Sequence, residues 1–196
     1  MKKTQKTALQ KTGGVTKSKN QADIAEQPGS WHLARSETER QLCDFEFGLE
    51  RLTQAYYRWK AACLAAVCDV PLTGDDVTVL NVVRMGDEPK RLSEIGQLLN
   101  RVDVPNMQYA TRKLVRAGLI ETEGSSSRKE TRYRATESGH EVTEAYAALR
   151  ATTLPPMLDA LDGGAANLAT TSIQMDMVTS LYGQAAQVAI TRRHQP

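Results

Sequence analysis

The feature that most constrains the fold is a fixed succession of local patterns between residues 92 and 134. Residues 92–100 carry apolar side chains at helical spacing, which predicts a short amphipathic helix. After a brief turn, residues 105–117 repeat a helical pattern, and Gly118 follows at a position where glycine commonly ends a helix. Two helices separated by so short a turn predict a helix-turn-helix unit.

A predicted hairpin follows the second helix directly. Residues 119–123 and 131–135 alternate in side-chain character, as half-buried strands do, and a polar loop joins them. Helix, turn, helix and hairpin in this order are typical of a winged helix. We therefore expect a mainly α protein with a small β-hairpin wing, in which a winged helix-turn-helix DNA-binding domain is flanked by N- and C-terminal dimerisation helices.

Positive charge is concentrated in the same stretch. Residues 89–134 hold ten Lys and Arg against five acids, whereas residues 31–88 hold six against ten and residues 135–196 three against six. Ordinary solvated surface charges would not segregate in this way. The basic stretch therefore predicts contact with the phosphates of double-stranded DNA.

The second predicted helix supplies side chains that can read base edges in the major groove. Asn106, Gln108 and Tyr109 lie near its N-terminus, where base edges come within reach. Asn and Gln side chains can pair bidentately with adenine, and an arginine such as Arg112 can pair with guanine. We take these four residues as candidates for base contacts.

Phosphate contacts are expected from four other basic residues. Lys113 and Arg116 lie farther along the second helix, where side chains more often meet the DNA backbone. Arg128 and Lys129 lie at the tip of the wing, where they would contact phosphates or enter a minor groove. The alternative for the wing tip is a flexible solvated loop.

Three segments of the chain form a set that points to one family. They are Leu-Ser-Glu-Ile-Gly at 92–96, a helix end that runs into Gly-Leu-Ile at 118–120, and Thr-Glu-Ser-Gly at 136–139. This set resembles the MarR family of bacterial winged-helix transcription regulators, over roughly residues 36–150. The family's wing usually carries an Asp followed by Arg residues, whereas this chain has Ser-Arg-Lys at 127–129 and lacks the acid that would brace the wing arginine.

The resemblance implies a homodimer that binds a pseudo-palindromic operator, with repression as the commoner mode. It also implies a small, often phenolic or anionic, effector in a cleft between the dimerisation helices and the winged helix. The aromatic groups that we consider first for such a ligand are Tyr56, Tyr57, Trp59 and His32. The alternative is that aromatic side chains at helical spacing belong to the core.

A long helix is predicted before the basic stretch. Ser36 and Glu39 form a capping box, and apolar side chains then recur at alternating steps of three and four from Leu42 to Val70, until Pro71 ends the helix. Such a stripe is roughly 50 Å long at 1.5 Å per residue, which exceeds what a small winged helix covers. We expect part of it to pack against a second element or a second chain.

Two more helices are predicted after the wing. The first begins at Thr136 and is interrupted at Pro155 and Pro156. In the last helix, the only charged residue between positions 165 and 190 is Asp176. Because so weakly charged a helix is poorly suited to full exposure, we expect it to be buried in an interface with the first long helix.

These patterns divide the chain into four parts. They are a basic disordered arm at 1–30, an N-terminal dimerisation helix at 31–72, the winged helix-turn-helix DNA-binding domain at 73–135, and C-terminal dimerisation helices at 136–196. The arm holds six lysines and has no acid before Asp23. It either adds non-specific phosphate contacts or keeps the protein soluble.

The three cysteines, Cys43, Cys63 and Cys68, all fall on predicted helix. Their odd number and their spacing favour neither a disulfide framework nor a metal site, so we predict a reducing cytoplasm, no metal and no cofactor. Some members of the family that the chain resembles sense redox state with a cysteine in the area of Cys43. Here the nearest basic neighbour is Arg40, so an activated thiolate is not indicated.

Other classes of protein lack support in the sequence. No apolar run approaches the roughly 20 residues of a membrane span, and the N-terminal lysines are not followed by the apolar segment of a secretory signal. Glycine-rich phosphate loops, nucleophile elbows and paired carboxylates are also missing, so we predict that the protein is not an enzyme and does not enter a membrane.

The sequence therefore favours a homodimeric, sequence-specific, MarR-like transcription regulator in the cytoplasm, and the resemblance implies a repressor that a small ligand releases. The alternative is a non-specific architectural DNA-binding protein or a winged-helix protein-interaction module.

Overall fold

The structure is a computed structural model that describes residues 31–124 and 131–193. It confirms a mainly helical chain with a small antiparallel wing. The chain divides within its first long helix, after Tyr57, into two compact units. The elements are α2 (Glu37–Ala65), α3 (Gly74–Arg84), the short 3-10 helix η1 (Met85–Asp87), β1 (Lys90–Arg91), α4 (Leu92–Leu98), α5 (Val104–Arg116), β2 (Ile120–Glu123), β3 (Arg132–Ala135), α6 (Glu137–Asp159) and α7 (Gly164–Arg193).

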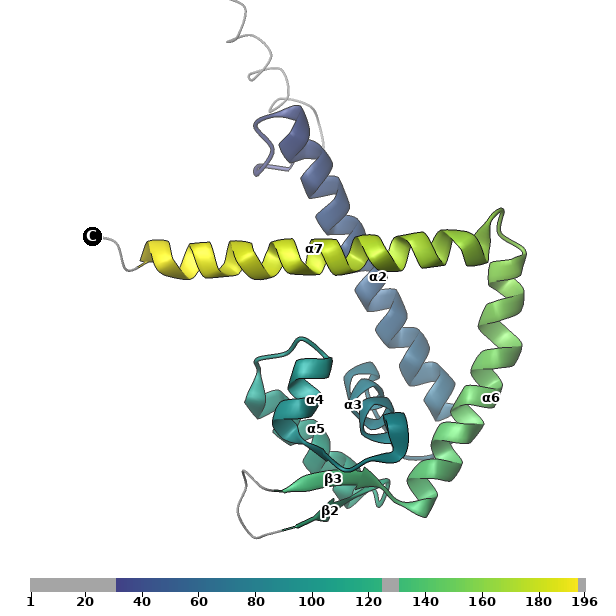
Figure 1. The fold of residues 1–196 in the computed structure, drawn as a ribbon. Helices are drawn as coiled ribbons and strands as arrows, with labels where there is room; N and C mark the ends of the chain where they lie inside the picture. The colour runs from purple at the N-terminus through teal and green to yellow at the C-terminus, as the bar shows by residue number, and fades with distance from the viewer. Residues whose placement is uncertain (1–30, 125–130, 194–196) are drawn as a thin grey trace, which may run out of the picture. The chain divides into compact units, whose positions relative to one another are not determined.

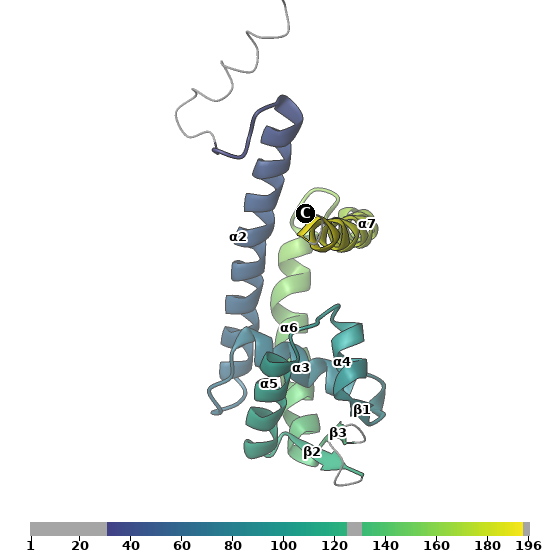
Figure 2. The ribbon, with the colours of Figure 1, turned by 90° about the vertical axis from the view of Figure 1, so that its left-hand side faces the viewer.

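The predicted helix, turn, helix and hairpin are present in the predicted order. Figure 1 shows α3, α4 and α5 gathered beside β2 and β3. The strands β2 and β3 pair antiparallel, with Thr122 opposite Tyr133. A third strand that the sequence did not predict, β1, pairs with the other edge of β3, and Figure 2 shows it beside α4.

One hydrophobic core holds the winged helix together. Its side chains come from α3, α4, α5, β2, α6 and the end of α2, and the best-buried members are no more than 2% exposed. They include Leu64, Val77, Val79, Leu80, Val83, Ile95, Leu114, Leu119 and Ile120. At roughly 1.5–3 kcal/mol for each fully buried aliphatic side chain, this cluster is the main stabilising contribution to the domain.

The N-terminus of α3 is fixed by a capping box at Thr73. The Thr73 hydroxyl accepts a hydrogen bond from the Asp76 N–H, and the Asp76 carboxylate accepts one from the Thr73 N–H at 2.8 Å. This reciprocal capping box satisfies two backbone donors that the first turn of a helix otherwise leaves without a partner. It also places the Asp76 carboxylate inside the domain, where its side chain is 4% exposed.

The Gly-Leu-Ile and Thr-x-x-Gly segments meet in space. Gly118 has a φ of +69° and turns the chain from α5 into β2. Thr136, the N-cap of α6, donates its hydroxyl proton to the Gly118 carbonyl at 2.6 Å and its N–H to the Leu119 carbonyl at 3.1 Å. A Cβ on Gly139 would lie 2.0 Å from that Leu119 carbonyl oxygen, so only glycine permits this approach of α6.

The first long helix is shorter than predicted, because α2 ends at Ala65 rather than next to Pro71. The Val67 N–H donates to the Leu64 carbonyl three residues back, which tightens the last turn. Val67, Cys68 and Val70 then pack against the core from the following loop. Burial of these side chains thus ends the helix before the proline does.

The N-terminal cap of α2 differs in part from the predicted capping box. The Ser36 hydroxyl accepts from the Glu39 N–H at 3.2 Å, as expected. The Glu39 carboxylate, however, accepts from the N–H of Arg35 at 2.7 Å. Farther along α2, the side chains of the apolar stripe between Leu42 and Tyr56 are about half exposed in the single chain.

The predicted interruption at Pro155 and Pro156 is wrong, since α6 continues through both to Asp159. A proline keeps a φ that a helix tolerates, and its cost lies mainly in the missing N–H and in crowding of the preceding turn. Both prolines lie on the exposed surface, where water can bind the carbonyls that they leave without a donor. At the C-cap, the Ala160 N–H donates to the Pro156 carbonyl at 3.3 Å.

The last helix follows α6 through a turn at Gly163, whose φ is +67°. Its large apolar side chains are exposed in the single chain, with Ile173 and Met177 each at 65% and Leu181 at 62%. Among the described residues, no helix combines the length and the hydropathy that a membrane span requires.

Candidate nucleic-acid interface

The turn between α4 and α5 brings the two helices into close contact. Asn100 adopts a positive φ of +52°, and the Arg101 N–H donates to the Gly96 carbonyl at 2.8 Å. A Cβ on Gly96 would lie 3.1 Å from both the Arg101 carbonyl oxygen and the Met107 Cε. The glycine of the Leu-Ser-Glu-Ile-Gly segment therefore packs closely against both the turn and Met107 of α5.

Helix α5 has one buried face and one exposed face. Met107, Ala110, Thr111 and Leu114 are buried against the core. The opposite face presents most of the predicted DNA-binding side chains, with Tyr109 63% exposed, Gln108 half-buried, and Asn106, Arg112 and Arg116 exposed. This is the face that a recognition helix needs for a DNA groove.

Two open grooves border this face. One, of about 200 Å³, is lined by Leu92, Gln108, Arg112, Thr131 and Tyr133 and lies between α5 and the wing. The other, of about 820 Å³, lies between α4 and α5, and Gln108 contributes to it as well. Gln108 is thus the base-reading candidate that both grooves share.

Thr131 and Tyr133 also line the groove beside α5, although no sequence pattern pointed to either of them. They lie two positions apart, and β3 (Arg132–Ala135) includes the second of them, so both point to the same side of the wing. Period-two alternation in the predicted strand could have identified them once the strand was known to run beside α5.

The side chains of Asn106 and Arg112 also make bonds within the turn and the helix. The Asn106 amide donates to the Asp103 carboxylate at 3.1 Å. The Arg112 Nε donates to the Gln108 carbonyl at 3.1 Å. The first bond ties Asn106 to the helix start, while the second orients the Arg112 guanidinium along the exposed face.

Lys113 differs from its neighbours on α5 because it has a partner inside the domain. Its ammonium lies 2.7 Å from the Asp76 carboxylate, which is 4% exposed, while the Lys113 side chain is 28% exposed. The positive charge of Lys113, which the sequence assigned to a phosphate contact, is therefore paired with an acid inside the domain.

Arg101, in the turn, makes a second internal ion-pair cluster. Its guanidinium donates two bonds to the Asp103 carboxylate, at 2.7 and 2.6 Å, and one to the Asp75 carboxylate at 2.6 Å. The Asp103 and Asp75 carboxylates raise the pKa of Arg101 above its usual range. The Arg101 guanidinium in turn holds the pKa of Asp103 well below its usual range.

The basic residues of the wing strands are also paired. Arg134 lies 2.7 Å from Glu121 across the hairpin, with both side chains about half exposed. Arg132 donates to the Pro89 carbonyl at 3.1 Å and so ties β3 to the chain before β1. The wing-tip candidates Arg128 and Lys129, like the basic arm at 1–30, lie outside the described residues.

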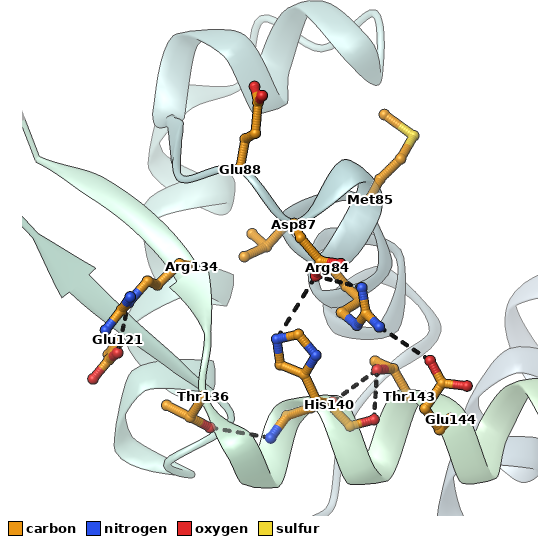
Figure 3. A network of polar contacts seen from close by, with 12 residues as sticks. Arg84, Met85, Asp87, Glu88, Glu121, Arg134, Thr136, His140, Thr143 and Glu144 are labelled. Atoms are coloured by element: carbon orange, nitrogen blue, oxygen red, sulfur yellow. Dashed lines mark hydrogen bonds and ion pairs between the residues drawn. The ribbon is translucent and has the colours of Figure 1, made fainter.

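A polar network connects the end of α3 with α6, as Figure 3 shows. The Arg84 guanidinium lies 2.5 Å from Asp87 and 3.0 Å from Glu144, and the His140 imidazole lies 3.7 Å from Asp87. His140 therefore has a structural neighbour in Asp87, within a network that fixes α6 against the DNA-binding domain. Thr143 hydrogen-bonds within α6 beside it.

The four ligand candidates have different surroundings. Tyr56 and Tyr57 are 54% and 37% exposed, with ring centroids 6.4 Å apart, and His32 is exposed. Trp59 packs edge-on against the Tyr146 ring at 6.1 Å and belongs to the partly buried shell of the core. Trp59 is therefore part of the core, as expected if the aromatic side chains on this helix do not bind a ligand.

The cysteines form no disulfide among the described residues. Cys63 is buried, its thiol lies 3.9 Å from the Tyr146 carbonyl, and burial raises the pKa of the thiol. Cys43 is buried as well. In the part of the chain that the structure describes, no group of three metal-ligating side chains comes together.

Comparison with known proteins identifies the domain. Residues 72–139 match the family model of the winged helix DNA-binding domain. A comparison with curated protein sequences finds no match.

Solved structures show the same fold. The chain is similar to a MarR family transcription regulator at 16% identity, with a TM-score of 0.59 over 75% of this chain and 93% of that chain. It is also similar to a cysteine mutant of MarR from E. coli in complex with operator DNA, at 18% identity and a TM-score of 0.58, over 73% and 99% of the two chains. A third similar structure is the transcriptional repressor CouR bound to a 23-mer DNA duplex, at 22% identity and a TM-score of 0.56, over 68% and 91%.

At these identities the likeness shows a shared fold.

Proposed function

We propose that this chain, whose winged helix DNA-binding domain has the fold of MarR family transcription regulators, is a homodimeric, sequence-specific DNA-binding regulator of the cytoplasm. The observation that carries the proposal is the outer face of α5, where Gln108 and Arg112 line the groove beside the wing and Tyr109 is exposed. Amide and guanidinium groups on an exposed helix can pair with base edges in the major groove. An α-helix also fits the width of that groove.

Dimerisation would supply the specificity that one recognition helix lacks. A single helix reads only a few base pairs, whereas a two-fold dimer places two helices in successive major grooves about one helical turn apart. The exposed apolar side chains of α7, with Ile173, Met177 and Leu181 above 60% exposure, favour burial against a second copy. The expected target is therefore a pseudo-palindromic operator.

Repression and release by a ligand are further parts of the proposal. CouR is a transcriptional repressor, and the MarR structure contains operator DNA. By analogy, this chain would repress by occupying its operator. An aromatic anion would then release it by binding near Tyr56, Tyr57 and His32, with Trp59 as part of the supporting core.

The effector proposal can be tested with benzoate as the probe. Benzoate should weaken operator binding by the full chain, and Tyr56→Ala should reduce this response while leaving operator affinity in its absence unchanged. An equal response in both proteins would remove Tyr56 from the site.

Direct base readout can be tested at Gln108. Gln108→Ala should weaken binding to the preferred operator more than to random DNA, by about 1–3 kcal/mol, because one bidentate pair is lost. The measurement is fluorescence anisotropy on both duplexes. Gln41→Ala, which removes the same amide from an exposed position of α2, is the matched control.

The outcome separates two kinds of DNA-binding protein. A larger loss on the operator supports sequence-specific regulation, since only a base contact depends on sequence. An equal loss on both duplexes would show that Gln108 does not read bases and would favour a non-specific architectural protein.

A further inference from the structure

Basic side chains from three different elements converge on the start of α3. Lys60 of α2 donates to the Thr78 hydroxyl, Arg101 of the turn pairs with Asp75, and Lys113 of α5 pairs with Asp76. The sequence gives no sign of this convergence, because the partners lie between 18 and 37 residues apart.

The Asp76 carboxylate that pairs with Lys113 is buried. The same Asp76 oxygen, Oδ2, that accepts from the Lys113 ammonium at 2.7 Å also accepts from the Thr73 N–H and the Thr73 hydroxyl. A carboxylate this deeply buried is costly unless a counter-charge stays beside it. The charge of Lys113 is therefore already neutralised inside the domain.

Arg101 is neutralised in the same way. Its side chain is 19% exposed and bonds to two carboxylates, bidentately to Asp103 and singly to Asp75. Bidentate pairs of guanidinium and carboxylate fix geometry as well as charge. A guanidinium held by two acids has little positive charge left for phosphate.

The ion pairs of Arg101 and Lys113 fix α5 near both of its ends. Asp103 is the N-cap residue of α5, and Lys113 lies in its last turn. At 1.5 Å per residue the two points are about 15 Å apart along the helix axis. A helix fixed at two such points cannot pivot against α3, so its exposed face keeps one direction.

We propose that Lys113 and Arg101 are positioning residues, which hold the recognition helix against the first turn of α3 and make no net contact with phosphate. The proposal rests on the proposed function, since it concerns how α5 is presented to DNA. It reassigns Lys113 from the phosphate-contacting role that its place in the sequence suggests. Arg116, exposed in the same last turn, keeps that role.

Salt dependence distinguishes the two roles. Each phosphate that a side chain neutralises adds about 0.9 to the slope of log affinity against log salt concentration. The affinity of the full chain for its selected operator is measured from low to moderate salt for the wild type, Lys113→Met, Arg116→Met and the double variant Asp76→Asn/Lys113→Met. Arg116→Met is the matched control for loss of an exposed charge on the same helix.

The positioning role predicts a specific set of results. Lys113→Met should lose roughly tenfold in operator affinity with an unchanged slope, because an unpaired buried carboxylate disturbs α5. The double variant should recover most of that affinity, since Asn at 76 can still accept from the Thr73 N–H without carrying a charge. Arg116→Met should lower the slope by about 0.9.

The opposite results would overturn the proposal. A slope lowered by about 0.9 in the double variant, which folds without a buried unpaired charge, would make Lys113 a phosphate contact. The salt slope of the double variant still distinguishes a phosphate contact from a positioning role if Lys113→Met alone fails to fold.

A readout without DNA separates this proposal from the proposed function. Amide hydrogen exchange along α5 should be faster in Lys113→Met and return to the wild-type rate in the double variant. If the wild type bound no DNA, the proposed function would fail while the exchange rates still decided the positioning role. Unchanged exchange in Lys113→Met would contradict it.

Discussion

At the scale of single residues, the most unusual group is the lysine at position 60. Lys60 is 3% exposed in the winged-helix unit, where burial lowers the pKa of its ammonium to about 8 despite the nearby Asp75 carboxylate. A lysine in water ionises near pH 10.4, so the folded protein holds this proton less tightly than the unfolded chain does. Below pH 8 the domain therefore carries the cost of a buried charge.

The resulting pH dependence has a definite sign. Between pH 8 and 10.5 the unfolded chain binds more protons at Lys60 than the folded protein, so the free energy of unfolding rises with pH over this window. At about 1.4 kcal/mol per pKa unit, the gain is at most roughly 3 kcal/mol. Lys60→Met should remove it, as urea unfolding of both proteins between pH 7 and 10.5 would measure. Parallel stability curves would show that Lys60 does not titrate in this range.

At the scale of elements, the junction of the wing with α6 depends on one glycine. The Thr136 cap and the Gly118 turn bring α6 so close to Leu119 that Gly139 has no room for a Cβ. This contact joins the hairpin to the helix that leads out of the DNA-binding domain. The contact explains why Gly-Leu-Ile and Thr-x-x-Gly occur as a pair.

Substitution of this glycine should be costly. Gly139→Ala should lower the free energy of unfolding by about 1–3 kcal/mol or more, because the new Cβ would meet a backbone carbonyl that cannot move away easily. Thermal and urea unfolding would measure the loss. Gly48→Ala is the control, since a Cβ there meets nothing within 4 Å and α2 should tolerate or prefer alanine. Equal effects at the two positions would argue against the close approach.

The sequence predicted best those helix ends and turns that depend on residues close together in the chain. The turn before α5 and the glycine stop at Gly118 are set by residues within a few positions, so the sequence placed both ends of α5 to within a residue or two. The strand β1 is only two residues long and exists because it pairs with β3, which no local pattern reveals. The end of α2 depended in the same way on burial of the following loop.

For the candidate site, the sequence could indicate which residues share a face of α5, but it could not indicate which of them bind other parts of the protein. Helical spacing placed Gln108 and Arg112 on one exposed face with Arg116. It could not show that Lys113 pairs with Asp76, because that acid belongs to another helix. Ion pairs between distant segments follow from the fold and cannot be read from residue type.

At the scale of the whole molecule, the exposed apolar surface of α7 is the main feature that a single chain leaves unexplained. Ile173, Met177 and Leu181 lie on one face of the helix, and each is more than 60% exposed. Monomeric proteins rarely expose a contiguous apolar surface of this kind. A second copy of the chain is the partner that the proposed function requires.

Charge placed on this face should break the dimer. Met177→Glu/Leu181→Glu should shift the protein from dimer to monomer, because burying two carboxylates in an apolar interface is unfavourable. Light scattering after size-exclusion chromatography would measure the molar mass. Thr179→Glu, which adds a charge on the other side of α7, is the control and should leave a dimer. A wild type that is monomeric at all concentrations would refute the dimer directly.

The most direct test of the account is selection of bound duplexes from a random DNA pool by the full chain at two salt concentrations. A dimeric, sequence-specific regulator should enrich a pseudo-palindrome whose half-sites lie about one helical turn apart, and the enrichment should survive the higher salt. Binding that is lost at higher salt and enriches no sequence would contradict the account and identify a non-specific DNA-binding protein.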